Sequence, residues 1–298
     1  MDKAKLKKRL KLVVQLLVAA LAIYLVTGQI DLQEYKKQLL GLHPGWLMLA
    51  VLAFNGSKVL SAFRLNYFFK SLGLSLGSVY NLKLYYLGML YNQVFPGGIG
   101  GDGYKVYLLN KLYETPVKGL ITATLLDRIS GVVALGFLAF ITGLFGSSAQ
   151  WLDTYSFLLW VGLIAAYPSY YLLVHFLFPS YKKYNHITNI QAIGVQGLQV
   201  LCAYFMLQAL GIEAGYMDYF TLFLVSSVAA ALPISAPGGL GVREWVMVEG
   251  AVIFALNGSA AAAFASIFFI ITLFSSLLGS VFIRQFRGPD GADSNQKT

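Results

Sequence analysis

NQVFPGGIGGDGYKVY, residues Asn92 to Tyr107, breaks an apolar stretch with five glycines, a proline, an aspartate and a lysine. Glycine lets the backbone approach a ligand closely. A helix that starts near Asp102 would turn its unpaired N–H groups and the positive end of its dipole towards the same point. The stretch therefore predicts a broken helix with an anion-binding tip, and a phosphate group is its natural occupant.

The composition around this stretch is that of a membrane protein. The chain has 298 residues, of which 57% are hydrophobic and 12% charged, and its mean hydropathy is +0.66. Crossing a bilayer takes about 20 mostly apolar residues, and six runs qualify: 12–27, 46–69, 119–144, 155–178, 187–210 and 259–283. We expect an all-α polytopic protein with a single transmembrane domain over residues 1–288 and a disordered tail at 289–298.

The charge, cysteine and histidine content excludes several functions. The net charge of +9 fits the excess of basic residues on the cytoplasmic side of membrane proteins, so we expect no nucleic-acid partner. A single cysteine, Cys202, excludes an internal disulfide, and the three histidines lack the spacing of metal ligands. The chain has no GxxxxGK[ST] pattern for ATP. We therefore expect no metal and no cofactor.

The distribution of Lys and Arg predicts the orientation. Six of them precede the first apolar run, Lys182 and Lys183 follow the fourth, and Arg284 follows the sixth, whereas the loop with Asp153 carries none. Because basic loops stay in the cytoplasm, we expect a multi-pass protein of the inner membrane with cytoplasmic N- and C-termini.

The opening stretch then forms a hairpin over 79–118 that enters from the cytoplasm and turns at Pro96–Gly101. Lysines flank it on both sides and are counted as cytoplasmic: Lys83, Lys105, Lys111 and Lys118. Such a shape is tolerated only where protein or a water-filled cavity shields the backbone.

A second broken stretch, SAPGGLGVREW at Ser235–Trp245, repeats the pattern. PGGLG at 237–241 follows PGGIG at 96–100 after 141 residues, which divides the chain into pseudo-repeats of about 46–144 and 187–283. Six spans plus two re-entrant hairpins would form an inverted repeat, whose broken helices meet around a substrate near the midplane. Two alternatives remain open: the second stretch contains two full crossings, giving eight spans, or both breaks are packing kinks.

Three motifs in this order resemble the lysylphosphatidylglycerol synthetase-type transmembrane family, also described as flippase-like. They are NQVFPGGIGGDGYKVYLL at 92–109, TATLLDRISGVVAL at 122–135 and SAPGGLGVREW at 235–245. In multidomain members this membrane region is joined to a soluble aminoacyl-transferase domain and is implicated in moving aminoacylated phospholipid between leaflets. The resemblance implies a lipid flippase whose partners are membrane lipids with an anionic phosphate. Because residues after 283 leave no room for a transferase domain, we expect no enzyme activity here and a possible separate lipid-modifying enzyme.

The predicted substrate-binding residues are those of the two glycine motifs and the polar groups beside them. They are Asn92, Gln93, Pro96, Gly97, Gly98, Gly100, Gly101, Asp102, Lys105, Pro237, Gly238, Gly239, Gly241, Arg243 and Glu244. The family often has arginine where this chain has Lys105, and lysine offers a point charge in place of a bidentate fork. Asp102 has an alternative role as a helix cap.

Four further charges fall inside apolar runs, where ionisable groups are costly and mark functional sites. Lys58, on the same helix face as Asn55, is either functional or bridged to Asp127 or Glu244. Arg64 is expected to snorkel to the cytoplasmic interface. Asp127 and Arg128 point about 100° apart on a helix, so each needs a partner on another element.

Two other functions compete with lipid translocation. One is a membrane enzyme, or enzyme subunit, that acts on polyprenyl-phosphate-linked sugars, with Asp102, Asp127 or Glu244 as general base or metal ligand. The absence of a DxD motif speaks against it. The other is a small-solute transporter built on inverted repeats, which would need no opening from its cavity to the bilayer.

Overall fold

The structure is a computed structural model that describes residues 3–95, 98–231 and 239–286, without the side chains of 3–12, 16 and 18. The predicted site residues Pro96, Gly97, Pro237 and Gly238, and the predicted tail at 289–298, lie outside the described residues. All regular structure in the described ranges is helical.

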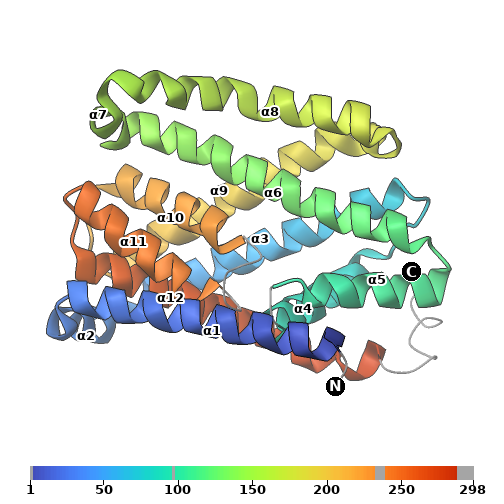
Figure 1. Cartoon of the computed structure of the whole chain (residues 1–298), viewed down its shortest axis with the longest axis horizontal. Coiled ribbons are helices and arrows are strands. Elements are labelled where there is room, and N and C mark those ends of the chain that lie inside the picture. Colours follow the sequence, from blue (N-terminus) through green and yellow to red (C-terminus); the bar gives the residue numbers. More distant parts are fainter. Residues whose placement is uncertain (1–2, 96–97, 232–238, 287–298) are drawn as a thin grey trace.

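The helices lie mostly along the long axis of the molecule (Figure 1). In chain order they are α1 (Lys3–Gln29), α2 (Leu32–Leu40), α3 (Pro44–Lys70), α4 (Ser78–Val94), α5 (Gly100–Tyr113), α6 (Val117–Phe145), α7 (Ser148–Leu152), α8 (Phe157–Leu177), α9 (Asn185–Ala209), α10 (Tyr216–Ala231), α11 (Val242–Ile253) and α12 (Gly258–Leu277). Short 3₁₀ turns accompany them: η1 (Asp153–Ser156), η2 (Pro179–Tyr184), η4 (Leu278–Phe282) and η5 (Arg284–Phe286).

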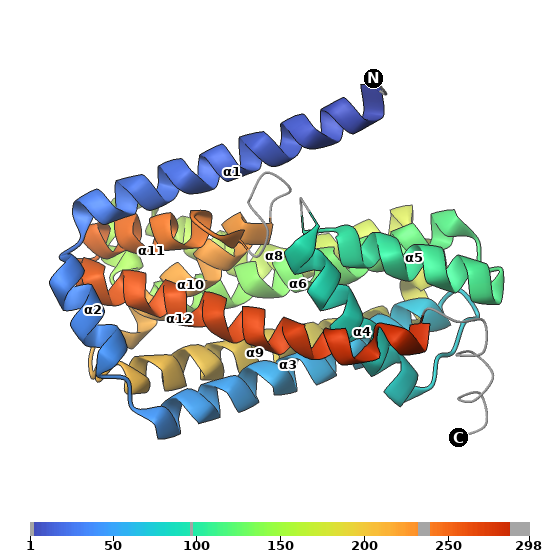
Figure 2. The same cartoon turned by 90° about the horizontal axis from the view of Figure 1, so that it is seen from below.

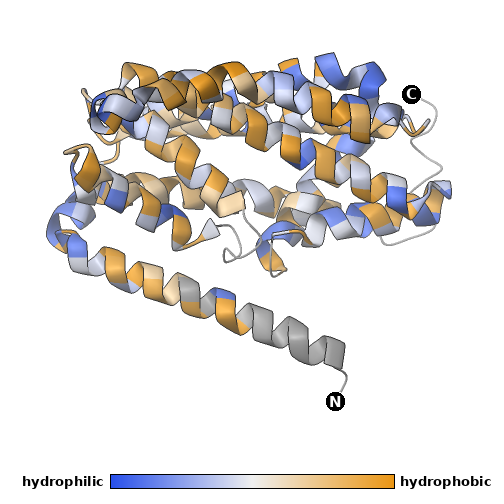
Figure 3. Ribbon diagram, turned by 45° about the horizontal axis from the view of Figure 1, so that its top comes forward, coloured by the Kyte–Doolittle hydropathy of each residue, from blue (hydrophilic) through white to orange (hydrophobic). Residues whose placement is uncertain are grey.

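Five helical segments of the described chain, built on α3, α6, α8, α9 and α12, are long and apolar enough to cross a membrane. The first predicted run lies in α1, which meets the same criterion only together with α2, and those two helices are bent by 98°. Orange, hydrophobic residues occur along most of the helices (Figure 3), and many large apolar side chains are exposed, as expected where lipid replaces water. The predicted all-α polytopic membrane fold is confirmed.

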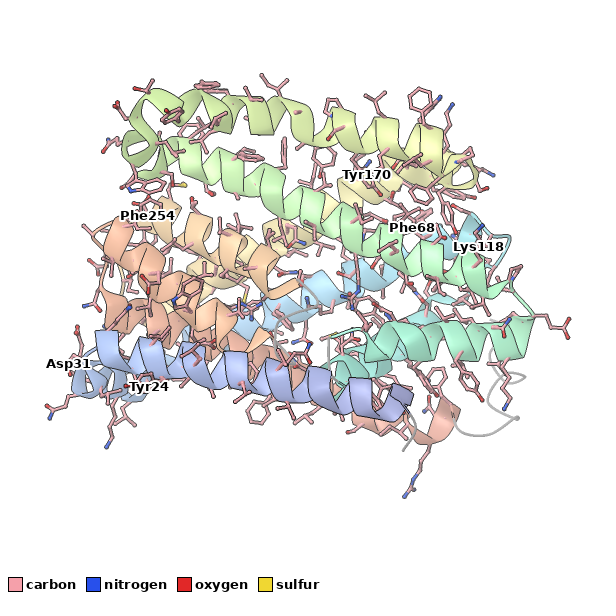
Figure 4. All side chains as sticks on the ribbon, in the orientation of Figure 1. Tyr24, Asp31, Phe68, Lys118, Tyr170 and Phe254 are labelled. Carbon is pink, nitrogen blue, oxygen red and sulfur yellow. The ribbon has the colours of Figure 1, made fainter. Side chains whose placement is uncertain are left out.

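Four shorter helices flank the two glycine motifs. α4 and α5 have 17 and 14 residues, and α10 and α11 have 16 and 12, all below the about 20 residues that a crossing takes. Figures 1 and 2 show α4 and α5 running in and back at one end of the molecule, and α10 and α11 doing the same at the other. Figure 4 labels Lys118 at the first end and Asp31 at the second, and these two residues name the ends below.

The two halves of the chain share one displacement. α3 begins at Pro44 and α9 at Asn185, and α6 begins at Val117 and α12 at Gly258, so each pair of starts is 141 residues apart. Gly98 and Gly239, separated by the same 141 residues, both have positive φ, at 62° and 76°. A left-handed backbone at matching places explains why both motifs need glycine there.

Two glycines bring α4 and α5 together closely. A Cβ at Gly101 would lie 1.9 Å from the Gly88 carbonyl oxygen, and one at Gly88 would lie 2.5 Å from the Lys105 side chain. The Asn92 carboxamide at the end of α4 accepts a hydrogen bond of 2.7 Å from the Gly101 backbone N–H. Because neither glycine has a side chain, α4 and α5 can cross closely. This crossing positions the first glycine motif between the two helices.

The apolar core of the described residues has two large clusters, beside a small one formed by α1, α11 and α12. One includes Phe54 of α3 with residues of α9 to α12, and the other includes Leu65 of α3 with residues of α4, α5 and α6. Between these two positions α3 presents Lys58, Ser61 and Arg64. The polar part of α3 thus lies where the two clusters adjoin, and this junction contains the candidate site.

Candidate functional site

A polar cavity of about 210 Å³ opens where α3, α4, α5, α6 and α9 meet. Four basic and two acidic side chains line it, which leaves a formal excess of two positive charges; they are Lys58, Arg64, Lys105, Arg128, Asp102 and Asp127. Uncharged residues complete the wall: Ser61, Tyr85, Met89, Asn92, Val195, Gln196 and Gln199. The charges come from three helices, α3, α5 and α6, so the tertiary packing assembles the site.

Asp102 connects the start of α5 to two cations. Its carboxylate accepts from the Lys105 ammonium at 3.2 Å and from the Arg128 guanidinium. Ile99 occupies the N-cap position of α5, so the alternative role of Asp102 as a helix cap is not what the structure shows. Arg128 also donates to the Gly98 carbonyl oxygen, which ties α6 to the first glycine motif.

Arg64 and Asp127 form the second ion pair of the cavity. Arg64 Nε lies 2.8 Å from Asp127 Oδ1, and Arg64 is only 4% exposed. The expectation that Arg64 snorkels to the interface is therefore wrong, because the inward-facing carboxylate of α6 attracts the guanidinium into the protein. As their angular separation requires, Asp127 and Arg128 do not pair with each other.

Lys105 is 4% exposed and faces the cavity, so counting it among the cytoplasmic flanking lysines was wrong. Its aliphatic chain lies against Gly88, and its ammonium lies 4.7 Å from the centre of the Tyr85 ring. The space left by the missing side chain of Gly88 is thus what admits Lys105 to the interior.

Lys58 lines the same cavity without an acidic partner. Its ammonium lies 4.3 Å from the centre of the Phe54 ring, and the described residues include no carboxylate within ion-pair distance of it. The expected alternative bridges to Asp127 and Glu244 are not formed. Asn55 contacts Ser275 and Tyr86, away from the cavity lining.

Among its described residues, 239–245, the second glycine motif contributes none to the lining of this cavity. Of the predicted residues in the first motif, Gln93, Gly98, Gly100 and Gly101 are also absent from the lining. Arg243 is 8% exposed and stacks 4.5 Å from the centre of the Phe268 ring. Glu244 accepts a hydrogen bond of 2.7 Å from the Gly241 N–H and so caps the start of α11. Both motifs were expected to share one site, whereas among the described residues only the first motif contributes to the cavity.

Two lining residues, Gln196 and Gln199 of α9, were missed from the sequence. Both are at least nine-tenths buried in an apolar helix, and Gln196 donates to the Gly131 carbonyl oxygen at 3.3 Å. Amide side chains at membrane depth were a usable signal, because an unsatisfied polar group in hydrocarbon costs several kcal/mol. Across the described ranges, no group of three or more His, Cys, Asp and Glu could hold a metal ion.

Fold and cavity together define a polytopic helical membrane protein with a buried cationic site. Residues 12–279 match the family model described as the lysylphosphatidylglycerol synthase TM region, and the chain belongs to this family. It is accordingly a membrane protein of lipid metabolism or transport. No curated protein matches the chain.

Proposed function

We propose that this protein moves an anionic, phosphate-bearing lipid between the leaflets, with the head-group phosphate in the cavity and the chains in the bilayer. The observation that carries the proposal is the excess of two positive charges in a buried cavity. Cations inside a membrane protein need a counter-charge. Asp102 and Asp127 supply only part of it, and an entering phosphate supplies the rest.

The chemistry of the donors suits a phosphate. Arg64 Nη1 is buried without a hydrogen-bond partner, and a guanidinium can offer two parallel donors to phosphate oxygens. The 14-residue helix α5 begins at the cavity, where its dipole also favours an anion. At about 210 Å³ the cavity is smaller than the about 300–1,000 Å³ of sites that enclose a whole small molecule, so the lipid chains would remain outside.

The arrangement of the helices supports a cavity near mid-depth. Lys58 lies 14 residues into the 27-residue helix α3, or roughly 21 Å along it. We infer that the α4–α5 and α10–α11 pairs are re-entrant hairpins that enter from opposite sides. In this arrangement the Lys118 end, where α1 begins and η5 lies, faces the cytoplasm, because basic residues gather there.

Translocation needs no bond to be made or broken, so we propose transport without chemistry. Any lipid-modifying reaction would belong to a separate enzyme. Transport and chemistry differ in one measurable respect, which is the mass of the head group after incubation with the protein.

Reconstitution into phosphatidylcholine vesicles tests the proposal. The vesicles carry a chain-labelled phosphatidylglycerol, lysylphosphatidylglycerol, polyprenyl phosphate or phosphatidylcholine, and leaflet exchange is followed by quenching the label from outside. We expect faster exchange of at least one anionic lipid than in empty vesicles, with an unchanged head-group mass. No acceleration for any anionic lipid, or equal acceleration of phosphatidylcholine, would contradict the proposal.

Arg128→Gln is the informative variant in this assay. A charge-assisted contact is worth about 1.5–3 kcal/mol, so we expect exchange to fall at least about tenfold. Arg284→Gln is the matched control, because Arg284 is exposed in η5 and forms no ion pair within the described residues. Exchange is scaled to folded protein, since Arg128 also holds Gly98.

A further inference from the structure

Arg243 is a buried cation that forms no ion pair within the described residues. Its side chain is 8% exposed, its Nε has no hydrogen-bond partner, and the described residues place no carboxylate at ion-pair distance. Glu244 is occupied at the Gly241 N–H. Arg243 also lies in the first turn of the 12-residue helix α11, where the helix dipole disfavours a cation. Both penalties disappear when an anion binds beside it.

A pair of aromatic rings links Arg243 to Lys58. Phe54 and Phe268 meet edge to face with their centres 5.6 Å apart; Lys58 lies over the first ring and Arg243 over the second. The rings hold both cations by cation–π attraction without adding negative charge. Lys58 also lines the cavity, so the ring pair connects the cavity to Arg243.

The displacement of 141 residues relates this arrangement to the cavity. It carries Asp102 onto Arg243 and Asp127 onto Phe268. The second half thus has an arginine and an aromatic ring where the first half has the two carboxylates. Among the described residues, no carboxylate forms an ion pair with Arg243 that an entering anion would have to displace.

The order of these groups follows the axis of α3. Arg64 lies six residues from Lys58 towards the Lys118 end, roughly 9 Å, and Phe54 lies four residues the other way, roughly 6 Å. Figures 1 and 2 agree that α5 extends from the middle towards the Lys118 end and α11 towards the Asp31 end.

We propose that Arg243 and Lys58 form a second phosphate subsite in series with the cavity, and that Lys58 belongs to both. This inference rests on the proposed function and deepens it, since it assigns the path of the same lipid phosphate. The phosphate leaves the ion-paired cations of the first half, passes Lys58 and is received by Arg243 next to the start of α11. Because Lys58 belongs to both subsites, the lipid phosphate stays next to a positive charge as it passes from one subsite to the other.

The test compares binding with transport in the full chain. Binding is the concentration of phosphatidylglycerol that raises the unfolding temperature in detergent, and transport is exchange of chain-labelled phosphatidylglycerol in vesicles. Arg243→Gln should cut exchange at least about tenfold while its binding in the cavity stays within about twofold of the parent. Lys58→Gln should weaken both measurements, and Arg284→Gln and Lys118→Gln should change neither.

A stability readout separates this role from a structural one. Because Arg243 has no carboxylate partner, Arg243→Gln should unfold at or above the parent temperature, and Arg243→Lys should recover part of the exchange. A lower unfolding temperature with unchanged exchange per folded molecule would overturn the subsite, as would unchanged exchange in a stable variant. If the parent protein moves no anionic lipid, the proposed function itself is refuted. If the parent moves lipid and Arg243→Gln exchanges it equally fast, only the second subsite is refuted.

Discussion

Arg64 and Asp127 show how far single residues can be understood from the sequence. The need of Asp127 and Arg128 for partners on other elements follows from helix geometry alone. The identity of those partners does not, because α3 is apolar on most sides and its sequence does not mark which face turns inwards. Arg64 lies within reach of the interface by depth, yet it faces a carboxylate in the interior, and only the packing of α3 against α6 decides this.

This pair gives a prediction for stability. The two side chains are 5% and 12% exposed, so Asp127→Asn leaves a buried guanidinium unpaired and should lower the free energy of unfolding by about 3–5 kcal/mol. The double variant Arg64→Met, Asp127→Leu should recover most of the loss, because neither charge remains. Thermal unfolding in detergent measures both, with Asp153→Asn in the exposed η1 turn as control. If Asp127→Asn is as stable as the parent, the ion pair does not contribute to the free energy of unfolding.

At the scale of elements, the glycine motif predicts a broken helix but not which glycines matter. Gly98 needs a left-handed backbone, and Gly101 needs the absence of a side chain at its crossing with Gly88. Gly103, in the same helix, has open space beside it. These roles depend on how closely α4 packs against α5, which the residues of the motif do not show by themselves.

The contrast between two glycines of α5 can be tested directly. In Gly101→Ala the new methyl would lie 1.9 Å from a carbonyl oxygen, so α4 and α5 must separate, and we expect a lower unfolding temperature and loss of lipid exchange. Gly103→Ala has no such clash and should be neutral or stabilising by up to about 1 kcal/mol, since alanine favours helix. Equal behaviour of the two variants in the unfolding and exchange assays would contradict the close crossing.

At the scale of the whole molecule, the apolar runs were the most predictable feature. The runs at 46–69 and 119–144 lie within α3 and α6, because about 20 apolar residues have few other options in a chain this hydrophobic. The cavity was harder to predict from the sequence. Its residues, such as Lys58, Asp102 and Gln199, share no local pattern and meet only through the packing of helices distant in sequence.

The orientation remains a prediction, and cysteine labelling of intact cells tests it. Thr154 in η1 and Lys182 in η2 are exposed and lie at opposite ends of the 21-residue helix α8, roughly 31 Å long. In a Cys202→Ala background, Thr154→Cys should react with an impermeant reagent from outside, and Lys182→Cys only after permeabilisation. Reaction of both from the same side would refute the arrangement.

The peripheral helix α8 determines the direction in which the second half of the chain runs relative to the first. α3 runs the length of the molecule and α6 returns, so the chain would begin its second half in the same sense as its first (Figures 1 and 2). One additional traverse by α8 moves the start of α9 to the opposite end, and the second half is turned over as a whole. Of its own side chains α8 buries only Tyr170 and Val174, and it contains Pro168. Packing therefore fixes few of its side chains, while its removal would place both short helix pairs at one end of the molecule.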